Sequence, residues 1–310
     1  MIKYTGTNYF KNKIINGNFD IWQRNTSQTS SGYGSDDKWA NSNIGSTKVH
    51  SRQTFTLGQT DVPNNPKYFS RTVVTSVAGV GNYVVKQQRI ENVKTLAGKI
   101  ATLSFYAKAD ANKNITVSFS QVFGTGGSPS EGLSINITTC SLTTSWQKFT
   151  IIIVFPSIVD KTLGTDGNDY LRLNFWFDAG SNYINSTNSL GQQSGTFDIA
   201  QVQLEEGSTA TEFEDRPLSI EEMLCYRYYQ TIRCSNISYA TGASQIFGGC
   251  ENFPVRMRNT PTGSLLSGAS MINAAGFGYN PVSTFTKFWA SSSGTGKIEY
   301  VQSIAFDAEL

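Results

Sequence analysis

The sequence predicts an all-β protein: an antiparallel β-sandwich (jelly roll), followed by a short helix and a small C-terminal β domain. From about Ile14 to Phe213, apolar residues alternate with polar ones in several short runs. This period of two is typical of strands that turn one face to a core and the other to water. Turn signals rich in glycine separate the runs, as in residues 124–132 and 164–169. Many short strands without intervening helices favour two packed sheets.

Four runs show the alternation most clearly. Their expected core-facing residues are Leu103, Phe105 and Ala107; Ile115, Val117 and Phe119; Leu133, Ile135 and Ile137; and Leu171, Leu173, Phe175 and Phe177. Residues 149–155 are apolar on both faces, so we expect them to form a central strand.

A helical pattern first occurs after Pro217, over residues 218–231. Ser219 followed by Glu222 is a capping box, with acidic residues in the first turn, where the helix dipole favours them. Apolar side chains cover most of the circumference, so this helix must be covered on more than one side. One sandwich covers a single side, and we expect the neighbouring subunits of a homotrimer to cover the rest. The expected interface residues are Ile220, Met223, Leu224 and Tyr228.

The remaining C-terminal residues return to short β runs, with loops rich in Gly, Ser, Ala and Asn. We therefore expect four segments along the chain. They are an N-terminal arm over 1–13, the jelly roll over 14–217, the helix over 218–231 and a C-terminal tip domain over 232–310.

The composition of the chain predicts a folded protein and argues against nucleic-acid and membrane partners. Charged residues make up 15% and aromatic residues 12% of the chain, which predicts folding because disordered chains are charged and poor in aromatics. The formal net charge is +2 and no basic stripe is present, so no nucleic-acid partner is expected. No apolar stretch is long enough for a bilayer-spanning helix, and residues 1–13 lack the apolar segment of a signal peptide. We expect neither membrane insertion nor export through a signal peptide.

The cysteines do not suggest a metal site. None of the four lies in a CxxC pair, and the one histidine has no cysteine neighbour, so a zinc site is not expected. We interpret all four as reduced, mostly buried thiols: Cys140, Cys225, Cys234 and Cys250.

Two blocks near the start resemble the opening of a domain common in phage tail-fibre and other virion proteins. They are IINGNFDIWQRNTS, residues 14–27, and DDKW, residues 36–39. That opening typically reads as an apolar pair, NG-x-F, then I-W-Q-R-G, then D-R-W. Here Asn25 stands where glycine is usual, and Lys38 where arginine is usual.

Later blocks follow the same order. Residues 197–217 resemble the closing strand of that domain, residues 221–230 its following helix, and residues 253–265 its C-terminal β domain. The first domain also resembles carbohydrate-binding modules of the jelly-roll type, which begin N-G-x-F and end on a strand that contains Asp.

The resemblance implies a virion structural protein, often a homotrimer and often engaged in host attachment. A tail-fibre or receptor-binding subunit would be made in the host cytoplasm, dock to other phage tail or virion proteins through residues 1–13, and contact a host-surface glycan or protein. One alternative is a capsid decoration or tail adaptor protein without a host ligand. A second is a polysaccharide depolymerase, which should show a long β-helix repeat or a clustered acid pair; we find neither.

We expect no catalytic residues. A Ser/His/Asp triad would need His50, which lies in the polar stretch TKVHSR and is interpreted as a surface histidine. Glu205 and Glu206 are the most conspicuous acid pair for glycoside hydrolysis, and we expect both to be solvent-exposed.

Sugars stack their apolar faces on aromatic rings, so exposed aromatics are candidate glycan contacts. We expect Trp22, Trp39 and Trp146 in the core. Trp176 falls on the polar face of its strand, where it is either covered by the second domain or available to a ligand. The preferred candidates are Tyr279, Phe288 and Trp289 in the tip domain; the alternative is that they fill the tip core or an interface between subunits.

No cofactor is expected apart from a structural calcium. In jelly-roll carbohydrate-binding modules a cation often links the first and last strands, and Asp20 and Asp198 fall near the matching positions. Calcium takes six to eight oxygen ligands, most of them not readable from sequence. The alternative is two ordinary aspartates at strand ends.

Overall fold

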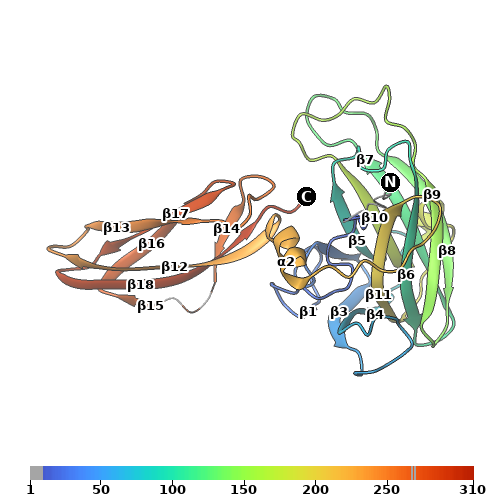
Figure 1. The fold of residues 1–310 in the computed structure, drawn as a ribbon, viewed down its shortest axis with the longest axis horizontal. Helices are drawn as coiled ribbons and strands as arrows, with labels where there is room; N and C mark the ends of the chain where they lie inside the picture. Colours follow the sequence, from blue (N-terminus) through green and yellow to red (C-terminus); the bar gives the residue numbers. More distant parts are fainter. Residues whose placement is uncertain (1–9, 267, 269) are drawn as a thin grey trace, which may run out of the picture. The chain divides into compact units, whose positions relative to one another are not determined.

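The computed structural model describes residues 10–266, 268 and 270–310 (Figure 1). Antiparallel strands dominate, so the prediction of an all-β fold with a β-sandwich is confirmed. The chain divides into two compact units, one that ends at Arg216 and includes Leu310, and one formed by Pro217–Glu309. Residues 1–9, most of the expected N-terminal arm, lie outside the described residues.

The first unit is a sandwich of two sheets. Sheet A has the strand order β1-β3-β4-β11-β6-β9, and sheet B the order β2-β5-β10-β7-β8. Sheet A consists of β1 (Ser27–Gln28), β3 (Thr47–Thr54), β4 (Tyr68–Thr75), β6 (Ile100–Ala109), β9 (Gln147–Val154) and β11 (Gly195–Glu206). Sheet B consists of β2 (Trp39–Ile44), β5 (Tyr83–Glu91), β7 (Lys113–Val122), β8 (Leu133–Leu142) and β10 (Tyr170–Ala179). Between β10 and β11 lie a 3-10 turn, η1 (Ser181–Tyr183), and the short helix α1 (Ile184–Thr187).

An apolar core fills the space between the two sheets. The ring of Phe105 on β6 is fully buried, with its centroid 5.1 Å from that of Phe175 on β10 and 5.3 Å from that of Phe149 on β9. Burying one such side chain contributes about 1.5–3 kcal/mol. The predicted core residues lie in this cluster except for Leu133 and Ile137 on β8. Leu133, the first residue of the strand, is exposed, and Ile137 is only partly buried because Asn136 adopts a φ of 46° and the pairing with β7 shifts there.

The prediction of a central strand over residues 149–155 is wrong. Strand β9 is an edge strand of sheet A, and among the described strands it pairs with β6 alone. Its core-facing residue Ile151 is buried, whereas Ile152 and Val154 point outward and are 54% and 69% exposed. The apolar residues on both faces of β9 are therefore explained by aliphatic side chains that are exposed at the sheet edge. They do not mean that both faces of the strand are buried.

The second unit begins with the helix α2 (Leu218–Tyr226), which is shorter than expected. Pro217 is the N-cap and no side chain caps the helix, so Ser219 does not form the predicted capping box. Of the expected interface residues, Tyr228 lies beyond the helix and is buried, Met223 is half exposed, and Ile220 and Leu224 are partly buried. No helix among the described residues is long and apolar enough to cross a membrane.

Two small sheets form the rest of this unit. In sheet C, β18 (Gly296–Asp307) pairs with β12 (Tyr229–Ala240) on one side and with β14 (Thr262–Leu265) and β15 (Ser270–Ile272) on the other. Sheet D has the order β13-β17-β16, formed by β13 (Ile246–Asn252), β17 (Phe285–Ser292) and β16 (Ala274–Pro281). Phe288, Tyr300 and Phe306 are buried in its core.

Candidate functional site

A β-bulge in β11 shapes the outer face of sheet A, the face turned away from the core. Ile199 and Val202 both face the core because β11 carries extra residues between Ala200 and Gln203 in its pairing with β6. Gln201, at a φ of 47°, joins the outer face and lines a pocket there. Bulges commonly re-aim a side chain in this way. The signal is present in FDIAQVQLEE, where the apolar positions shift from 197 and 199 to 202 and 204, and our prediction overlooked it.

The segment after β11 folds back over this outer face. Glu205, expected to be exposed, is buried, and its carboxylate accepts hydrogen bonds from the N–H (2.9 Å) and the hydroxyl (2.7 Å) of Thr211. The side-chain oxygen of Gln203 accepts the N–H of Glu214 at 2.7 Å. These bonds hold residues 207–214 against the sheet. The neighbouring Glu206 is exposed, as expected.

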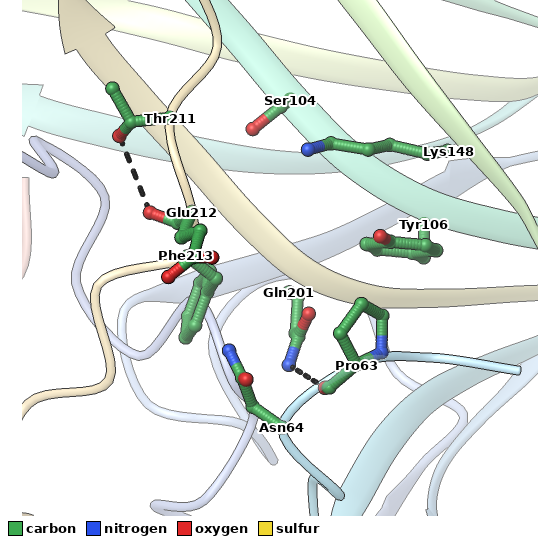
Figure 2. A pocket seen from close by; sticks show the side chains of 9 residues that line it. All are labelled: Pro63, Asn64, Ser104, Tyr106, Lys148, Gln201, Thr211, Glu212 and Phe213. Carbon is green, nitrogen blue, oxygen red and sulfur yellow. Dashed lines mark hydrogen bonds between the residues drawn. The ribbon is translucent and has the colours of Figure 1, made fainter. Parts of the chain in front are cut away.

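The pocket has a volume of about 130 Å³ and lies between sheet A and two loops (Figure 2). Strands β6, β9 and β11 supply one wall, the loop between β3 and β4 a second, and the segment after β11 a third. Its lining consists of Pro63, Asn64, Ser104, Tyr106, Lys148, Gln201, Thr211, Glu212 and Phe213. The amide of Gln201 donates to the carbonyl of Pro63 at 2.8 Å and so joins the sheet to the first loop. The volume is below that of typical ligand pockets, which suits one ring of a larger ligand.

Ser104 is the most informative residue of the lining. It is 5% exposed and lines the pocket from β6. No other described residue hydrogen-bonds its hydroxyl, which is not among the fully enclosed polar atoms that lack a partner. The hydroxyl therefore opens onto the pocket, where a ligand or a water molecule can bond it.

Aromatic side chains continue the outer face beside the pocket. Tyr106 lines the pocket and also packs in a cluster with Trp146, Phe55 and Phe69. The ring centroids of Phe55 and Phe69 both lie 5.3 Å from that of Trp146, and the ammonium of Lys108 lies 5.3 Å from that ring. Burial raises the pKa of the Tyr106 hydroxyl, which therefore stays protonated at neutral pH.

The indole N–H groups separate the five tryptophans into two sets. Trp22, Trp39 and Trp176 each donate to an acceptor of the sandwich at 2.5–3.2 Å. No described residue accepts the N–H of Trp146 or Trp289. Trp39 is a core residue as predicted, whereas Trp22 and Trp146 are only partly buried. A buried or half-buried indole usually finds a hydrogen-bond acceptor. The indole N–H groups of Trp146 and Trp289 can therefore still donate to a ligand or to water.

Trp176 is not available to a ligand in this structure. It is 9% exposed, and its ring packs against those of Tyr83 and Tyr183, with centroids 5.7 Å and 5.4 Å away. The cover comes from the same sandwich, because η1 places Tyr183 over the outer face of sheet B.

The three tip-domain candidates occupy different environments. Phe288 is 3% exposed and packs in the core against Phe277 and Tyr300, so it is a core residue rather than a ligand contact. Tyr279 is partly buried, and its hydroxyl donates to the carbonyl of Gly263 at 2.7 Å. Trp289 is 39% exposed on the outer face of sheet D.

Asp20 and Asp198, the two candidates for a structural calcium, each bond side chains of the sandwich. Both oxygens of Asp198 accept hydrogen bonds from the guanidinium of Arg71, at 2.7 Å and 2.8 Å. Asp20 accepts the amide of Asn18 at 2.9 Å. No group of three or more acidic, histidine or cysteine side chains that could hold a metal ion is found in the described part of the chain. The Asp198 carboxylate therefore already has a cationic partner on sheet A.

His50 is not a surface residue. Its side chain is fully buried, with Nε2 3.0 Å from a carboxylate oxygen of Asp36 and Nδ1 3.2 Å from the hydroxyl of Thr72. The other oxygen of Asp36 accepts a hydrogen bond from the ammonium of Lys86, which also donates to the side-chain oxygen of Asn41 at 3.0 Å. We call these five residues the Asp36 cluster. The expectation failed because the polar stretch around His50 packs against other polar groups inside the sandwich.

Burial and charge pairing set the protonation states in the Asp36 cluster. Burial alone would raise the pKa of Asp36, but the charge of Lys86 and the hydrogen bonds from its neighbours hold it below its usual range. Burial lowers the pKa of His50 to about 4, against the opposing effect of Asp36. Burial also lowers the pKa of Lys86 to about 8. At neutral pH the cluster therefore contains a carboxylate, an ammonium and a neutral imidazole that donates from Nε2 to Asp36.

The motifs that carry the virion-protein resemblance form the framework around this cluster. Asn16 adopts a φ of 55° and its side chain bonds both the N–H and the carbonyl of Ile21. A Cβ on Gly17 would lie 2.2 Å from the carbonyl oxygen of Val202, so only glycine fits there. Trp22 stacks on His50 at 5.6 Å. These residues make contacts that the fold of the sandwich requires. Their presence in the sequence therefore indicates this fold and not a particular ligand.

We expect the sandwich to lose stability as the pH falls from 6.5 to 5. His50 stays neutral in the fold until about pH 4, while in the unfolded chain it takes up a proton near pH 6.5. The unfolded state then binds more protons and is favoured, by about 2 kcal/mol at pH 5. Urea unfolding followed by tryptophan fluorescence measures this, because Trp22, Trp39, Trp146 and Trp176 all lie in the first unit.

The control for this prediction is His50→Gln, which removes the sole histidine of the chain. The variant should be less stable than the parent at pH 7, since it removes the imidazole ring on which Trp22 stacks. Its free energy of unfolding should nevertheless change little between pH 6.5 and 5.5. The same slope in parent and variant would contradict a neutral, buried His50.

Several solved structures are similar to the sandwich at low identity. A family 4 carbohydrate-binding module is 16% identical, with 62% of this chain and 98% of that chain covered, at a TM-score of 0.34. A family 11 module from Clostridium thermocellum is 10% identical, with 59% and 98% covered, at a TM-score of 0.33. The enzymatically active domain of tailspike protein 4 of bacteriophage CBA120 is 14% identical, with 64% and 22% covered, at a TM-score of 0.35. No family model and no curated protein sequence matches the chain.

Proposed function

We propose that this chain is a phage virion structural protein, a tail-fibre or receptor-binding subunit, that attaches to a host-surface glycan through the pocket on sheet A. The observation that carries the glycan assignment is Ser104, whose hydroxyl bonds no other described residue and opens onto a small, polar and aromatic pocket. The virion assignment rests on the sequence blocks 14–27, 36–39 and 197–217.

The pocket lining suits a sugar ring. Sugars present hydroxyl groups at the edge of the ring and apolar C–H groups on its faces. Ser104, Asn64, Lys148 and Glu212 offer donors and acceptors for the edge, and the ring of Tyr106 offers an apolar face (Figure 2). Pockets with a few convergent polar groups among aromatic ones are typical of small-ligand sites.

We propose that the binding is non-catalytic. Glycoside hydrolysis uses a pair of carboxyl groups on either side of the scissile bond. Glu212 is the single carboxylate among the nine residues that line the pocket. Asp36 and His50 are buried away from solvent and cannot reach a polysaccharide.

Removal of pocket side chains should weaken glycan binding by the full chain. Tyr106→Ala should weaken it about tenfold, ~1.4 kcal/mol, through loss of the stacking face. Ser104→Ala should weaken it about two- to tenfold, the effect of one hydrogen bond. Both are measured as equilibrium binding to an array of bacterial surface polysaccharides.

Thr150→Ala is the matched control, because Thr150 lies opposite Ser104 on β9 and is exposed outside the pocket lining. It should bind like the parent. Equal binding by all four proteins would place the glycan elsewhere, and absence of binding by the parent would refute the proposed ligand class.

An antibody against this chain should decorate the tail of the phage that encodes it. Gold-labelled electron micrographs of intact virions measure this directly. Label on the head would favour the capsid-decoration alternative, and virions without label would remove the protein from the particle.

We further propose a homotrimer with its contacts at α2, where Met223 is 50% exposed and Leu224 is partly buried in the single chain. Leu224→Asp should give monomers or aggregates in light scattering, since an apolar side chain buried in the interface contributes about 1.5–3 kcal/mol per copy. Ser219→Asp, an exposed position of the same helix, is the control and should remain trimeric. A stable trimer from Leu224→Asp would contradict this interface.

A further inference from the structure

Trp289 lies between two glycines on the outer face of sheet D. In the register of the sheet, Gly248 on β13 and Gly278 on β16 are its direct neighbours on either side. A Cβ on Gly278 would lie 2.4 Å from Cε2 of Trp289, and a Cβ on Gly248 would lie 3.0 Å from its Cβ. The indole therefore extends over Gly278, against the backbone of β16.

The two glycines have different causes. A Cβ on Gly248 would lie 2.3 Å from the carbonyl oxygen of Phe288, so the close approach of the neighbouring strand requires glycine there. At Gly278 the φ is not positive, and the atoms that a Cβ would meet belong to the indole of Trp289. Glycine within a strand weakens it and often marks the close approach of a ligand or another backbone. Here Gly278 keeps the space beneath the indole free of side chains. The result is a flat aromatic surface in the middle of a sheet face.

The remaining surroundings of the ring are mainly polar, with one large apolar neighbour. Lys287 and Asn280 lie in the adjacent row of the register and are exposed, and Ser291 follows two residues along β17. Ile246, which is 72% exposed, pairs with Ser291, and the exposed Cys250 pairs with Lys287. Lys287 is the charged side chain of these rows, with no acidic residue beside it on this face. The indole N–H has no acceptor among the described residues, so it is open to a ligand oxygen.

We infer that Trp289 is a stacking platform for the ring of an anionic pyranose, such as a uronic or sialic acid unit of a surface glycan. The indole face would receive the C–H face of the sugar, Lys287 would pair with its anionic group, and the indole N–H and Asn280 would reach its hydroxyls. A protein interface is less suited to this surface, because binding hot spots sit within a rim of contacts that exclude water, whereas glycines and exposed polar side chains flank Trp289 and Ile246 is the one large apolar side chain among the described residues of the adjacent rows. The platform shares the glycan class with the proposed function but lies in the other unit of the chain.

The test uses the full chain labelled with 5-fluorotryptophan, in which Trp289→Phe assigns the Trp289 signal in fluorine NMR spectra. Titration with tetragalacturonate or with sialyllactose should shift this signal saturably, and neutral cellotetraose should shift it at least tenfold more weakly. Lys287→Gln should remove that preference for the anionic sugars. No shift with either anionic sugar, or an equal shift with cellotetraose, would overturn the inference.

Three further variants distinguish sugar binding on this platform from binding elsewhere on the chain. Gly278→Val keeps the tryptophan but displaces the indole, and should weaken binding about tenfold. Tyr239→Ala removes a 76% exposed aromatic from sheet C and should change nothing. Tyr106→Ala should leave the Trp289 shift intact even if the pocket on sheet A binds no glycan. A Trp289→Ala variant that dissociates the oligomer and still binds the sugars would assign the residue to a subunit contact instead, and would also overturn the inference.

Discussion

The buried charge of Asp36 is the constraint around which the first unit is organised. The carboxylate joins the two sheets, because it bonds His50 on β3 of sheet A and Lys86 on β5 of sheet B. Leaving one buried charge without its partner costs about 3–5 kcal/mol, so the sheets are held in one relative position. The geometry also explains the opening motif of the chain: Trp22 stacks on His50, and the ammonium of Lys86 lies 5.0 Å from the ring of Trp39.

This arrangement separates the residues that fix the fold from those that line the pocket. The residues of the opening motif are committed to the Asp36 cluster and to the core, so they are not free to follow a ligand. The pocket-lining side chains on the outer face of sheet A do not belong to the Asp36 cluster or to the core. They range from the small hydroxyl of Ser104 to the long cationic side chain of Lys148. Binding residues commonly lie on loops that a rigid scaffold presents, and here two loops close over a rigid strand surface.

Alternation was sufficient to predict the strands β6, β7, β8 and β10 and most of the core residues that they carry, because burial on one face imposes a period of two. It could not distinguish an exposed apolar edge from a central strand, as β9 demonstrates. It could not place His50, because the partners of a buried polar residue come from distant parts of the chain. Of the predicted glycan contacts, Phe288 and Trp289 are adjacent on β17 and face opposite sides, so at most one of them could be exposed. Whether Phe288 or Trp289 is the exposed residue depends on how β17 pairs with β13 and β16. No local sequence pattern specifies this pairing.

The bulge in β11 has a consequence for how this protein can diversify. Beyond Gln201 every side chain of the strand owes its direction to the irregular pairing with β6. A deletion of one residue at this point would turn Gln203 and Glu205 towards the apolar core and Val202 and Leu204 towards water. Small insertions and deletions at the bulge would therefore destabilise the sandwich. The loops on either side are free to change in length. Loop exchange and point substitution would therefore change the lining of the pocket while the register of β11 stays fixed.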